Sequence, residues 1–233
     1  MLQSIEAVAF DLDGTLYPDY RFNMKIIPFA LKEWRLLSAF GRARRILRAR
    51  QESDDFTPPE DFYRKQAELT GELLGRPAGE TREKINRLMY RGWEPLFKDI
   101  PLFPAVLNTL KALKAAGYKL GLLSDFPPLA KLQYMGLSDL WETALCSEDT
   151  GALKPHKRPF LELAEKLALP CEKILYVGNS LPYDIAGASR CGMKTAWKKS
   201  IFSLPSGRLP VGRKITADFS FTNYRKLHDF VLN

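Results

Sequence analysis

The chain is poor in residues on which several kinds of protein depend. Its 233 residues include two histidines and three cysteines, Cys146, Cys171 and Cys191, with no C-x-x-C pair. Scarce histidine weakens any Ser-His-Asp, Cys-His or histidine-rich metal scheme. The cysteine spacing encodes neither a local zinc site nor a redox pair, so free thiols in a reducing cytosol are expected.

Long apolar runs are also missing. No stretch approaches the roughly 20 residues needed to span a bilayer. No charged segment followed by an apolar one precedes the first predicted strand, so no signal peptide is expected. We therefore predict a cytoplasmic protein without a membrane span. The composition, 45% apolar and 27% charged, is typical of a globular chain. The length is sufficient for one α/β domain and a smaller accessory domain.

Positive charge is concentrated in one segment. The formal net charge is +8, and residues 21–50 contain nine basic residues and one acid, so the remaining residues are balanced. The simplest interpretation is a helix that packs Phe29, Trp34, Leu36 and Phe40 against its neighbours and leaves its arginines in water. Attraction of an anionic substrate and binding of anionic lipid or nucleic acid are alternatives. We expect no nucleic-acid partner.

Apolar and turn-forming residues alternate in a pattern typical of an α/β protein. Strands are predicted at 7–10, 119–124, 143–147, 173–177, 193–197 and 217–221. Helices are predicted between and after them at 105–116, 129–135, 159–169, 184–191 and 224–232. This order predicts a doubly wound, Rossmann-like parallel sheet with helices on both faces.

The segment 17–98 interrupts that alternation. It contains three predicted helices, at 26–50, 59–74 and 80–97. We therefore predict an α/β core formed by residues 1–16 and 99–233, with a small α-helical cap formed by residues 17–98. The Pro- and Gly-rich stretch 203–214 is predicted to be a surface loop.

Two carboxylates directly follow the first predicted strand, in Asp11-Leu12-Asp13-Gly14-Thr15. Residues two apart in a strand share a face, and open α/β sheets bind ligands at the carboxyl ends of their strands. Two acids held so close repel each other, so a cation is expected beside them. Gly14 permits a sharp turn. A simple Asx/Gly turn is the alternative.

Polar residues also follow three later strands. Ser124-Asp125 follows one, Lys154-Pro155 lies in a rigid turn after another, and Asn179 and Asp184 follow Gly178. A hydroxyl and an ammonium suit phosphate oxygens, whereas carboxylates suit a hard cation. Each has an ordinary alternative, such as a solvated lysine or, for Asp184, a helix cap. Their occurrence at four successive strand ends favours one shared site.

This set of motifs resembles the haloacid-dehalogenase-like (HAD) hydrolase superfamily, most of whose members are phosphatases. The first motif, D-x-D-G-T, is intact at Asp11–Thr15, and Ser124 and Lys154 match the second and third motifs. The fourth motif is usually G-D-x(3–4)-D. Here Asn179 replaces its first acid, while Gly178 and Asp184 remain. The helical insert resembles the cap domain of this superfamily.

The resemblance implies a Mg²⁺-dependent hydrolase that cleaves a small phosphorylated metabolite through an aspartyl phosphate. Asp11 would be the nucleophile, and Asp13 the general acid and then the general base. The phosphate would be bound by Ser124, Asp125 and Lys154. The metal ligands would be Asp11, the backbone carbonyl of Asp13, Asn179 and Asp184. Because an amide adds no charge, Asn179 predicts weaker metal binding.

Two other functions remain open at this point. Dehalogenases of the same superfamily share the fold and the nucleophile but need no metal and lack the second acid, so Asp13 and Lys154 favour phosphate chemistry. A ligand-binding or regulatory protein with little turnover is the second alternative, supported only by Asn179. The sequence leaves the substrate and the oligomeric state open.

Overall fold

A computed structural model describes residues 4–53, 55–199 and 215–233. The described chain contains a six-stranded sheet of order β3-β2-β1-β4-β5-β6, and every neighbouring pair is parallel. The strands are β1 Ala7–Phe10, β2 Lys119–Ser124, β3 Thr143–Cys146, β4 Ile174–Gly178, β5 Lys194–Lys198 and β6 Phe219–Phe221. The predicted doubly wound parallel fold is therefore confirmed, whereas the predicted loop 203–214 lies outside the described residues.

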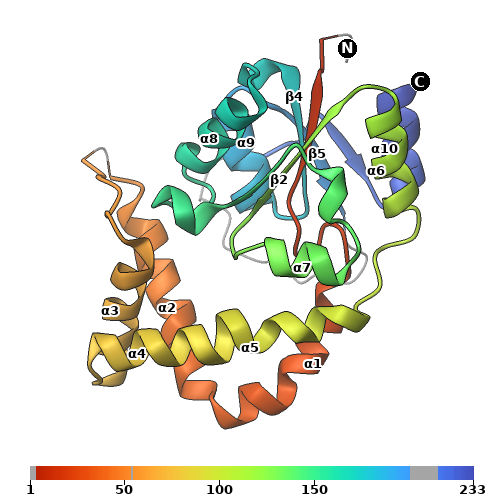
Figure 1. The fold of residues 1–233 in the computed structure, drawn as a ribbon. Helices are drawn as coiled ribbons and strands as arrows, with labels where there is room; N and C mark the ends of the chain where they lie inside the picture. Colours follow the sequence, from red (N-terminus) through yellow and green to blue (C-terminus); the bar gives the residue numbers. More distant parts are fainter. Residues whose placement is uncertain (1–3, 54, 200–214) are drawn as a thin grey trace.

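The central strand β1 is buried on both faces, as its apolar sequence requires. Ala7 and Ala9 belong to an apolar cluster shared with helices α8 (Lys157–Leu167) and α9 (Ala186–Arg190). Val8 and Phe10 belong to the cluster shared with α6 (Val106–Ala115) and α10 (Tyr224–Leu232). Figure 1 shows these two helical layers on opposite sides of the sheet. Because β2 and β4 flank β1, the carboxyl ends of three adjacent strands meet at one edge.

A helical region is inserted between β1 and β2, and in Figure 1 it lies beyond the end of β1 that leads into α1. Its helices are α1 Asp19–Lys32, α2 Trp34–Arg50, α3 Phe62–Leu74, α4 Ala78–Ile85 and α5 Arg91–Trp93. A π-turn at Asn86–Tyr90 precedes α5, and a 3₁₀ turn at Glu94–Asp99 follows it. The helical insert is confirmed, and the domain boundaries at 16/17 and 98/99 stay predictions.

The prediction of one helix over residues 26–50 is wrong. The helix begins at Asp19, and the chain leaves helical geometry at Glu33 (φ −117°, ψ 30°) before α2 begins. A straight helix would separate Phe29 and Phe40 by roughly 16 Å along its axis. The bend allows both rings to pack in one apolar cluster with residues of α3 and α4.

The other two predicted cap helices have shifted ends. The second begins at Phe62 rather than at residue 59, because the Asp61 carboxylate caps it by accepting the N–H of Arg64 at 2.8 Å. The third begins at Ala78 and continues through the π and 3₁₀ turns to Asp99.

The apolar residues of the basic segment divide into buried and exposed groups. Leu36 and Phe40 are buried and Phe29 is half-buried, as expected. The assignment of Trp34 to the cap interior is wrong, since 64% of this residue is exposed. Four large apolar residues of α1 are exposed with it, namely Tyr20, Met24, Ile27 and Leu31. No helix within the described residues has the length and apolar character needed to cross a bilayer.

One arginine of the basic segment fastens the cap to the core. Arg44 in α2 is buried and forms an ion pair with Glu148, which follows β3 in the core. Its Nη1 also donates to Gln66 of α3 at 3.0 Å, and Tyr90 donates to Glu148 at 2.9 Å. Burial raises the pKa of Glu148, although the Arg44 charge opposes this. The expectation that the arginines lie in water is therefore wrong for Arg44, and also for Arg48, whose guanidinium forms an ion pair with Asp125 of the core.

Candidate active site

The first motif forms a tight loop at the carboxyl end of β1. The Asp11 N–H donates to the carbonyl of Val177 in β4 at 2.9 Å, and the Thr15 hydroxyl donates to Asp11 Oδ2 at 2.7 Å. Gly14 has a φ of 81°, and a Cβ there would lie 2.2 Å from the Asn179 side chain. A glycine is therefore required both by the turn and by the close approach of Asn179.

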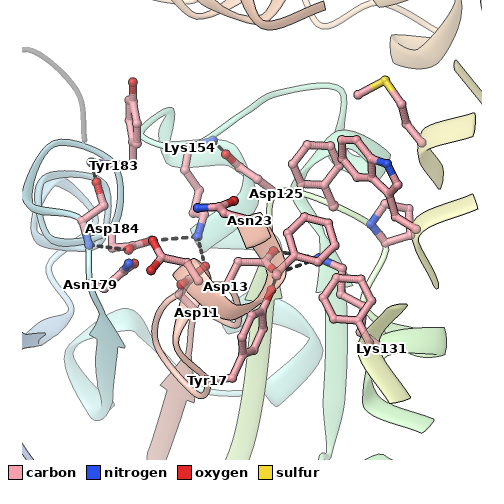
Figure 2. A pocket seen from close by; sticks show the side chains of 18 of the residues that line it. Asp11, Asp13, Tyr17, Asn23, Asp125, Lys131, Lys154, Asn179, Tyr183 and Asp184 are labelled. Carbon is pink, nitrogen blue, oxygen red and sulfur yellow. Dashed lines mark hydrogen bonds and ion pairs between the residues drawn. The ribbon is translucent and has the colours of Figure 1, made fainter. Parts of the chain in front are cut away.

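A buried lysine joins two of the predicted acids. Lys154 Nζ lies 2.7 Å from Asp11 Oδ1 and 2.7 Å from Asp184 Oδ1, and all three side chains are at least nine-tenths buried. Figure 2 shows the ammonium between the two carboxylates. Burial lowers the pKa of Lys154, but the charges of Asp11 and Asp184 outweigh this and hold it well above its usual value.

One ammonium does not neutralise two carboxylates. Burial and the charge of Asp184 raise the pKa of Asp11 to about 7, although Lys154 acts in the opposite direction. A group so perturbed in a cavity is typical of functional sites. The pair Asp11 and Asp184 therefore has the electrostatic character of a cation site.

The second acid of the first motif has different partners. Asp13 accepts from Lys131 Nζ at 2.7 and 2.8 Å, from Ser124 Oγ at 3.2 Å and from the Tyr17 hydroxyl. Burial would raise the pKa of Asp13, but the Lys131 charge and these hydrogen bonds outweigh it and hold the pKa below its ordinary value. Figure 2 shows Asp13 directed toward Lys131 and Tyr17. The two acids of the motif thus differ in protonation behaviour.

The fourth motif approaches the first through a second glycine. A Cβ at Gly178 would lie 2.4 Å from the Asp184 side chain, so only glycine allows that carboxylate to enter the site. Asp184 Oδ2 accepts the N–H of Ser180 at 2.9 Å. Asp184 lies within a π-turn at Leu181–Ile185, so the prediction that a helix begins there is wrong, and Ser180 rather than Asp184 provides the cap.

The donors around Asp11 fit a hard cation. Asp11 and Asp184 supply carboxylate oxygens, and Asn179 lies beside them in Figure 2. No group of three or more His, Cys, Asp or Glu side chains with metal-binding arrangement occurs in the described part of the chain. The predicted ligand set agrees with this, because Asp11 and Asp184 are its only carboxylate side chains. Asp13 would contribute its backbone carbonyl, and its carboxylate contacts Lys131 instead. Oxygen donors of this kind are those that Mg²⁺ prefers.

The carboxylate of Asp125 is occupied by other groups. Its Oδ2 accepts from Arg48 Nη2 at 2.5 Å, and its Oδ1 accepts from the Ser147 hydroxyl at 2.6 Å. The arginine and the hydroxyl hold the pKa of Asp125 below its ordinary value against the effect of burial. A phosphate contact through this residue would therefore use its backbone N–H rather than its anionic side chain.

Sequence reasoning missed three cationic side chains of the site region. The sequence pattern predicts a helix at residues 129–135 but no role for Lys131, which lies in α7 (Leu129–Tyr134), and it places the arginines of the basic segment, including Arg44 and Arg48 of α2, in water. Arg48 Nε donates to the Lys154 carbonyl at 2.9 Å. The sequence does contain a signal that these two arginines face the interior. Arg44 and Arg48 lie four and eight residues after the apolar Phe40, so they share its face of the helix.

A parallel sheet with a helical cap over its carboxyl edge, and an aspartate paired with a buried lysine at the end of β1, define a hydrolase of the capped Rossmann-like class. The family described as haloacid dehalogenase-like hydrolase matches residues 5–192. The chain therefore belongs to the haloacid dehalogenase-like hydrolase family.

Curated relatives within this family carry phosphatase names. The chain is 30% identical to a glyceraldehyde 3-phosphate phosphatase of Methanopyrus kandleri, over 82% of this chain and 82% of that protein. It is 31% identical to a phosphoglycolate phosphatase of Salmonella paratyphi A, over 82% of this chain and 80% of that protein.

Solved structures with the same fold include a dehalogenase and a magnesium-bound hydrolase. A dehalogenase with an intermediate complex aligns with a TM-score of 0.68 at 18% identity, covering 100% of both chains. The magnesium-bound HAD-hydrolase YfnB from Bacillus subtilis aligns with a TM-score of 0.64 at 17% identity, covering 98% of this chain and 99% of that one. At these identities the likeness shows the fold alone.

Proposed function

We propose that this protein is a Mg²⁺-dependent phosphomonoesterase that acts through an aspartyl phosphate. The observation that carries the proposal is that Asp11 and Asp13 lie in different chemical surroundings. Asp11 lies against a buried ammonium beside a second carboxylate, whereas Asp13 lies among proton-donating groups of Lys131, Tyr17 and Ser124. The phosphatase names of the relatives support the same chemistry.

In the first step a carboxylate oxygen of Asp11 attacks phosphorus, and the bond between phosphorus and the ester oxygen breaks. Asp13 transfers a proton to that departing oxygen, which leaves as an alcohol. Asp13 is held ionised before substrate binds, because its pKa is lowered by Lys131. A phosphate dianion arriving beside it would raise that pKa, so Asp13 would take up a proton from solvent when substrate binds and would then transfer it to the ester oxygen.

In the second step Asp13 accepts a proton from a water molecule, whose oxygen attacks the phosphorus of the aspartyl phosphate. The bond between phosphorus and the Asp11 oxygen breaks, which releases inorganic phosphate and restores the carboxylate. Lys154 offsets the charge on the transferring group, and the Lys131 and Tyr17 contacts hold Asp13 in place. The cap covers the site and limits access of bulk water.

The proposed metal ligands are the side chains of Asp11, Asp184 and Asn179 and the backbone carbonyl of Asp13. When bound, Mg²⁺ supplies the positive charge that offsets repulsion between the Asp11 carboxylate and a phosphate dianion, which amounts to several kcal/mol at about 4 Å and an effective dielectric near 20. Burial and the charge of Asp184 raise the pKa of Asp11 in spite of Lys154, so the lysine does not offset the negative charge of the site even before a phosphate binds.

Chelation should abolish the activity. We expect the purified protein to hydrolyse 4-nitrophenyl phosphate with Mg²⁺, to lose roughly 100-fold or more of kcat/KM in EDTA, and to recover when Mg²⁺ is restored in excess. The measurement is nitrophenolate release, with halide release from 2-chloropropionate followed in parallel. EDTA-resistant halide release would instead support a dehalogenase. No turnover of either compound above the buffer control would support a binding protein.

Replacing Asn179 with Asp should strengthen metal binding. The added charge faces Asp11 and Asp184 and raises affinity for a dication, so the Mg²⁺ concentration for half-maximal activity should fall by about 10-fold. The measurement is a Mg²⁺ titration of kcat/KM. The neighbouring Ser180→Asp variant is unsuitable as a control because Ser180 caps the π-turn, so Asn23→Asp at the cavity wall serves instead. An unchanged or higher requirement in Asn179→Asp would exclude this residue from the metal side of the site.

A further inference from the structure

A cavity of about 390 Å³ separates the catalytic groups from the cap. Asp11, Asp13 and Lys154 line it from the core, and residues of α1, the π-turn, α5 and the 3₁₀ turn line it from the cap. A volume of this size lies within the range of cavities that bind drug-sized molecules. It exceeds what a phosphate with a two- or three-carbon chain requires, so the lining determines which leaving group it suits.

Much of the cavity lining is aromatic. We call five of its residues, Phe22, Tyr90, Trp93, Phe97 and Phe126, the aromatic wall. The rings form two groups. In the first, the ring centre of Phe22 lies 4.8 Å from that of Phe97, on which it stacks, and 5.5 Å from that of Trp93, which it meets edge-on. In the second, the ring centres of Tyr90 and Phe126 lie 6.2 Å apart. Several aromatic rings are visible beside Lys131 in Figure 2. Planar rings held by one another offer a preformed surface for another ring.

Apart from Lys154, the cations that line the cavity are Lys131 and Arg48, and both are already paired. Lys131 Nζ lies 4.9 Å from the Phe97 ring centre and 5.5 Å from that of Phe126, but its charge is matched by Asp13. Arg48 is matched by Asp125. These side chains therefore do not provide a free positive charge for an anionic leaving group.

The unmatched charges of the lining are negative. Asp19 and Glu94 line the cavity, and neither forms an ion pair with another residue in the described ranges. A carboxylate on the leaving group would be repelled by them. The cavity thus combines an apolar, planar surface with two acidic side chains in its lining that are unpaired within the described residues.

We propose that the leaving group of the physiological substrate is an aromatic alcohol without a carboxylate, whose ring packs against the aromatic wall. This inference rests on the proposed phosphomonoesterase function and specifies its substrate class. It differs from the small polar substrates in the names of the curated relatives, because a two-carbon acid bound at Asp11 would leave the aromatic wall in contact with water. Trp93 and Phe22 are the residues expected to determine this preference.

The test compares three phosphate esters whose alkoxide leaving groups have similar basicity: n-propyl, 2-cyclohexylethyl and 2-phenylethyl phosphate. Their chemical step is equally demanding, so differences in kcat/KM report contacts of the leaving group. We expect 2-phenylethyl phosphate to exceed n-propyl phosphate by about 10- to 100-fold. The cyclohexyl ester should be clearly poorer than the phenyl ester, because its ring is not planar. Phosphoglycolate should be poorer than ethyl phosphate, and Glu94→Gln should narrow that gap.

Variants then locate the preference. Trp93→Ala and, as a milder change, Phe22→Leu should each bring the ratio of kcat/KM for the phenylethyl and propyl esters close to 1. Trp34→Ala is the matched control, because Trp34 is an exposed tryptophan of the same cap and does not line the cavity. It should keep the wild-type ratio. Thermal unfolding of each variant identifies any that fails to fold.

The possible results separate the two proposals. If wild-type protein with Mg²⁺ hydrolyses none of the esters, the proposed phosphomonoesterase function fails. If it hydrolyses all of them but the propyl and phenylethyl esters are equal, or the cyclohexyl ester equals the phenyl ester, only the aromatic preference is overturned. A ratio that persists in both folded Trp93→Ala and Phe22→Leu variants would overturn the role of the aromatic wall.

Discussion

Replacing Asp11 with Asn should reduce kcat for phosphomonoesters by roughly 10⁴-fold or more, because the proposed nucleophile is lost while the rest of the cavity remains. The second observable is the intermediate. Mass spectrometry of acid-quenched wild-type enzyme should detect a phosphoryl group on the peptide that contains Asp11, and the variant should carry none. Asp229→Asn, at an exposed position of α10, is the control and should retain activity. Phosphorylation of another residue would contradict the assignment.

The same variant should change the pH dependence of stability. The folded-state pKa of Asp11 is about 7, above the ordinary value of 3.8, so ionising it costs more in the folded protein than in the unfolded chain. Without metal, the free energy of unfolding should therefore fall as pH rises from about 4 to 7. The contribution of Asp11 to this fall is on the order of a few kcal/mol. In the Asp11→Asn variant, the free energy of unfolding measured with urea should not show this fall between about pH 4 and pH 7. Excess Mg²⁺ should reduce it in wild type, since a dication favours the carboxylate.

Replacing Lys154 with Met should cause the second large loss. Two buried carboxylates, Asp11 and Asp184, would lose their common partner, and breaking a buried ion pair by removing one side costs about 3–5 kcal/mol of unfolding free energy. The loss measured by urea unfolding should be larger at pH 8 than at pH 6, because a carboxyl left without the ammonium can protonate at lower pH. Activity should fall by roughly 10³-fold.

Two comparisons separate charge from packing at this position. Lys157→Met, at an exposed residue three positions along the chain, should change unfolding free energy by no more than about 0.5 kcal/mol. The double variant Lys154→Met with Asp184→Asn should recover much of the lost stability but no activity, since it removes the excess charge without restoring the ammonium. A double variant as unstable as Lys154→Met would show that the uncompensated charge of Asp184 does not cause the loss of stability.

Local sequence patterns predicted much of the core. The strand at 119–124 and the helix at 224–232 have the predicted ends, because each is an apolar pattern bounded by turn or capping residues. The cap was predicted less well. The bend at Glu33 and the π and 3₁₀ turns after Ile85 leave no mark in the spacing of apolar residues, which continues through them.

The residues of the candidate site also fall into those that the sequence predicted and those that it did not. Asp11, Ser124, Lys154 and Asp184 were predicted because each follows a strand, and strand ends of a parallel sheet meet at one edge. Lys131, Arg44 and Arg48 were missed because their partners are remote: the Lys131–Asp13 contact spans 118 residues, and the Arg48–Asp125 contact spans 77. A basic residue on a helix is usually solvated, so its type alone gives no reason to expect burial.

The sequence by itself determined the sheet, the helical insert and the four segments that carry catalytic residue types, since these depend on hydrophobic periodicity and on side-chain chemistry within short stretches. Only the tertiary structure decided which charges pair. It placed one lysine between Asp11 and Asp184 and another on Asp13, and it gathered five aromatic rings in the lining of the same cavity. Such pairing depends on distances between segments far apart in the chain, and these are set when the cap and the core pack together.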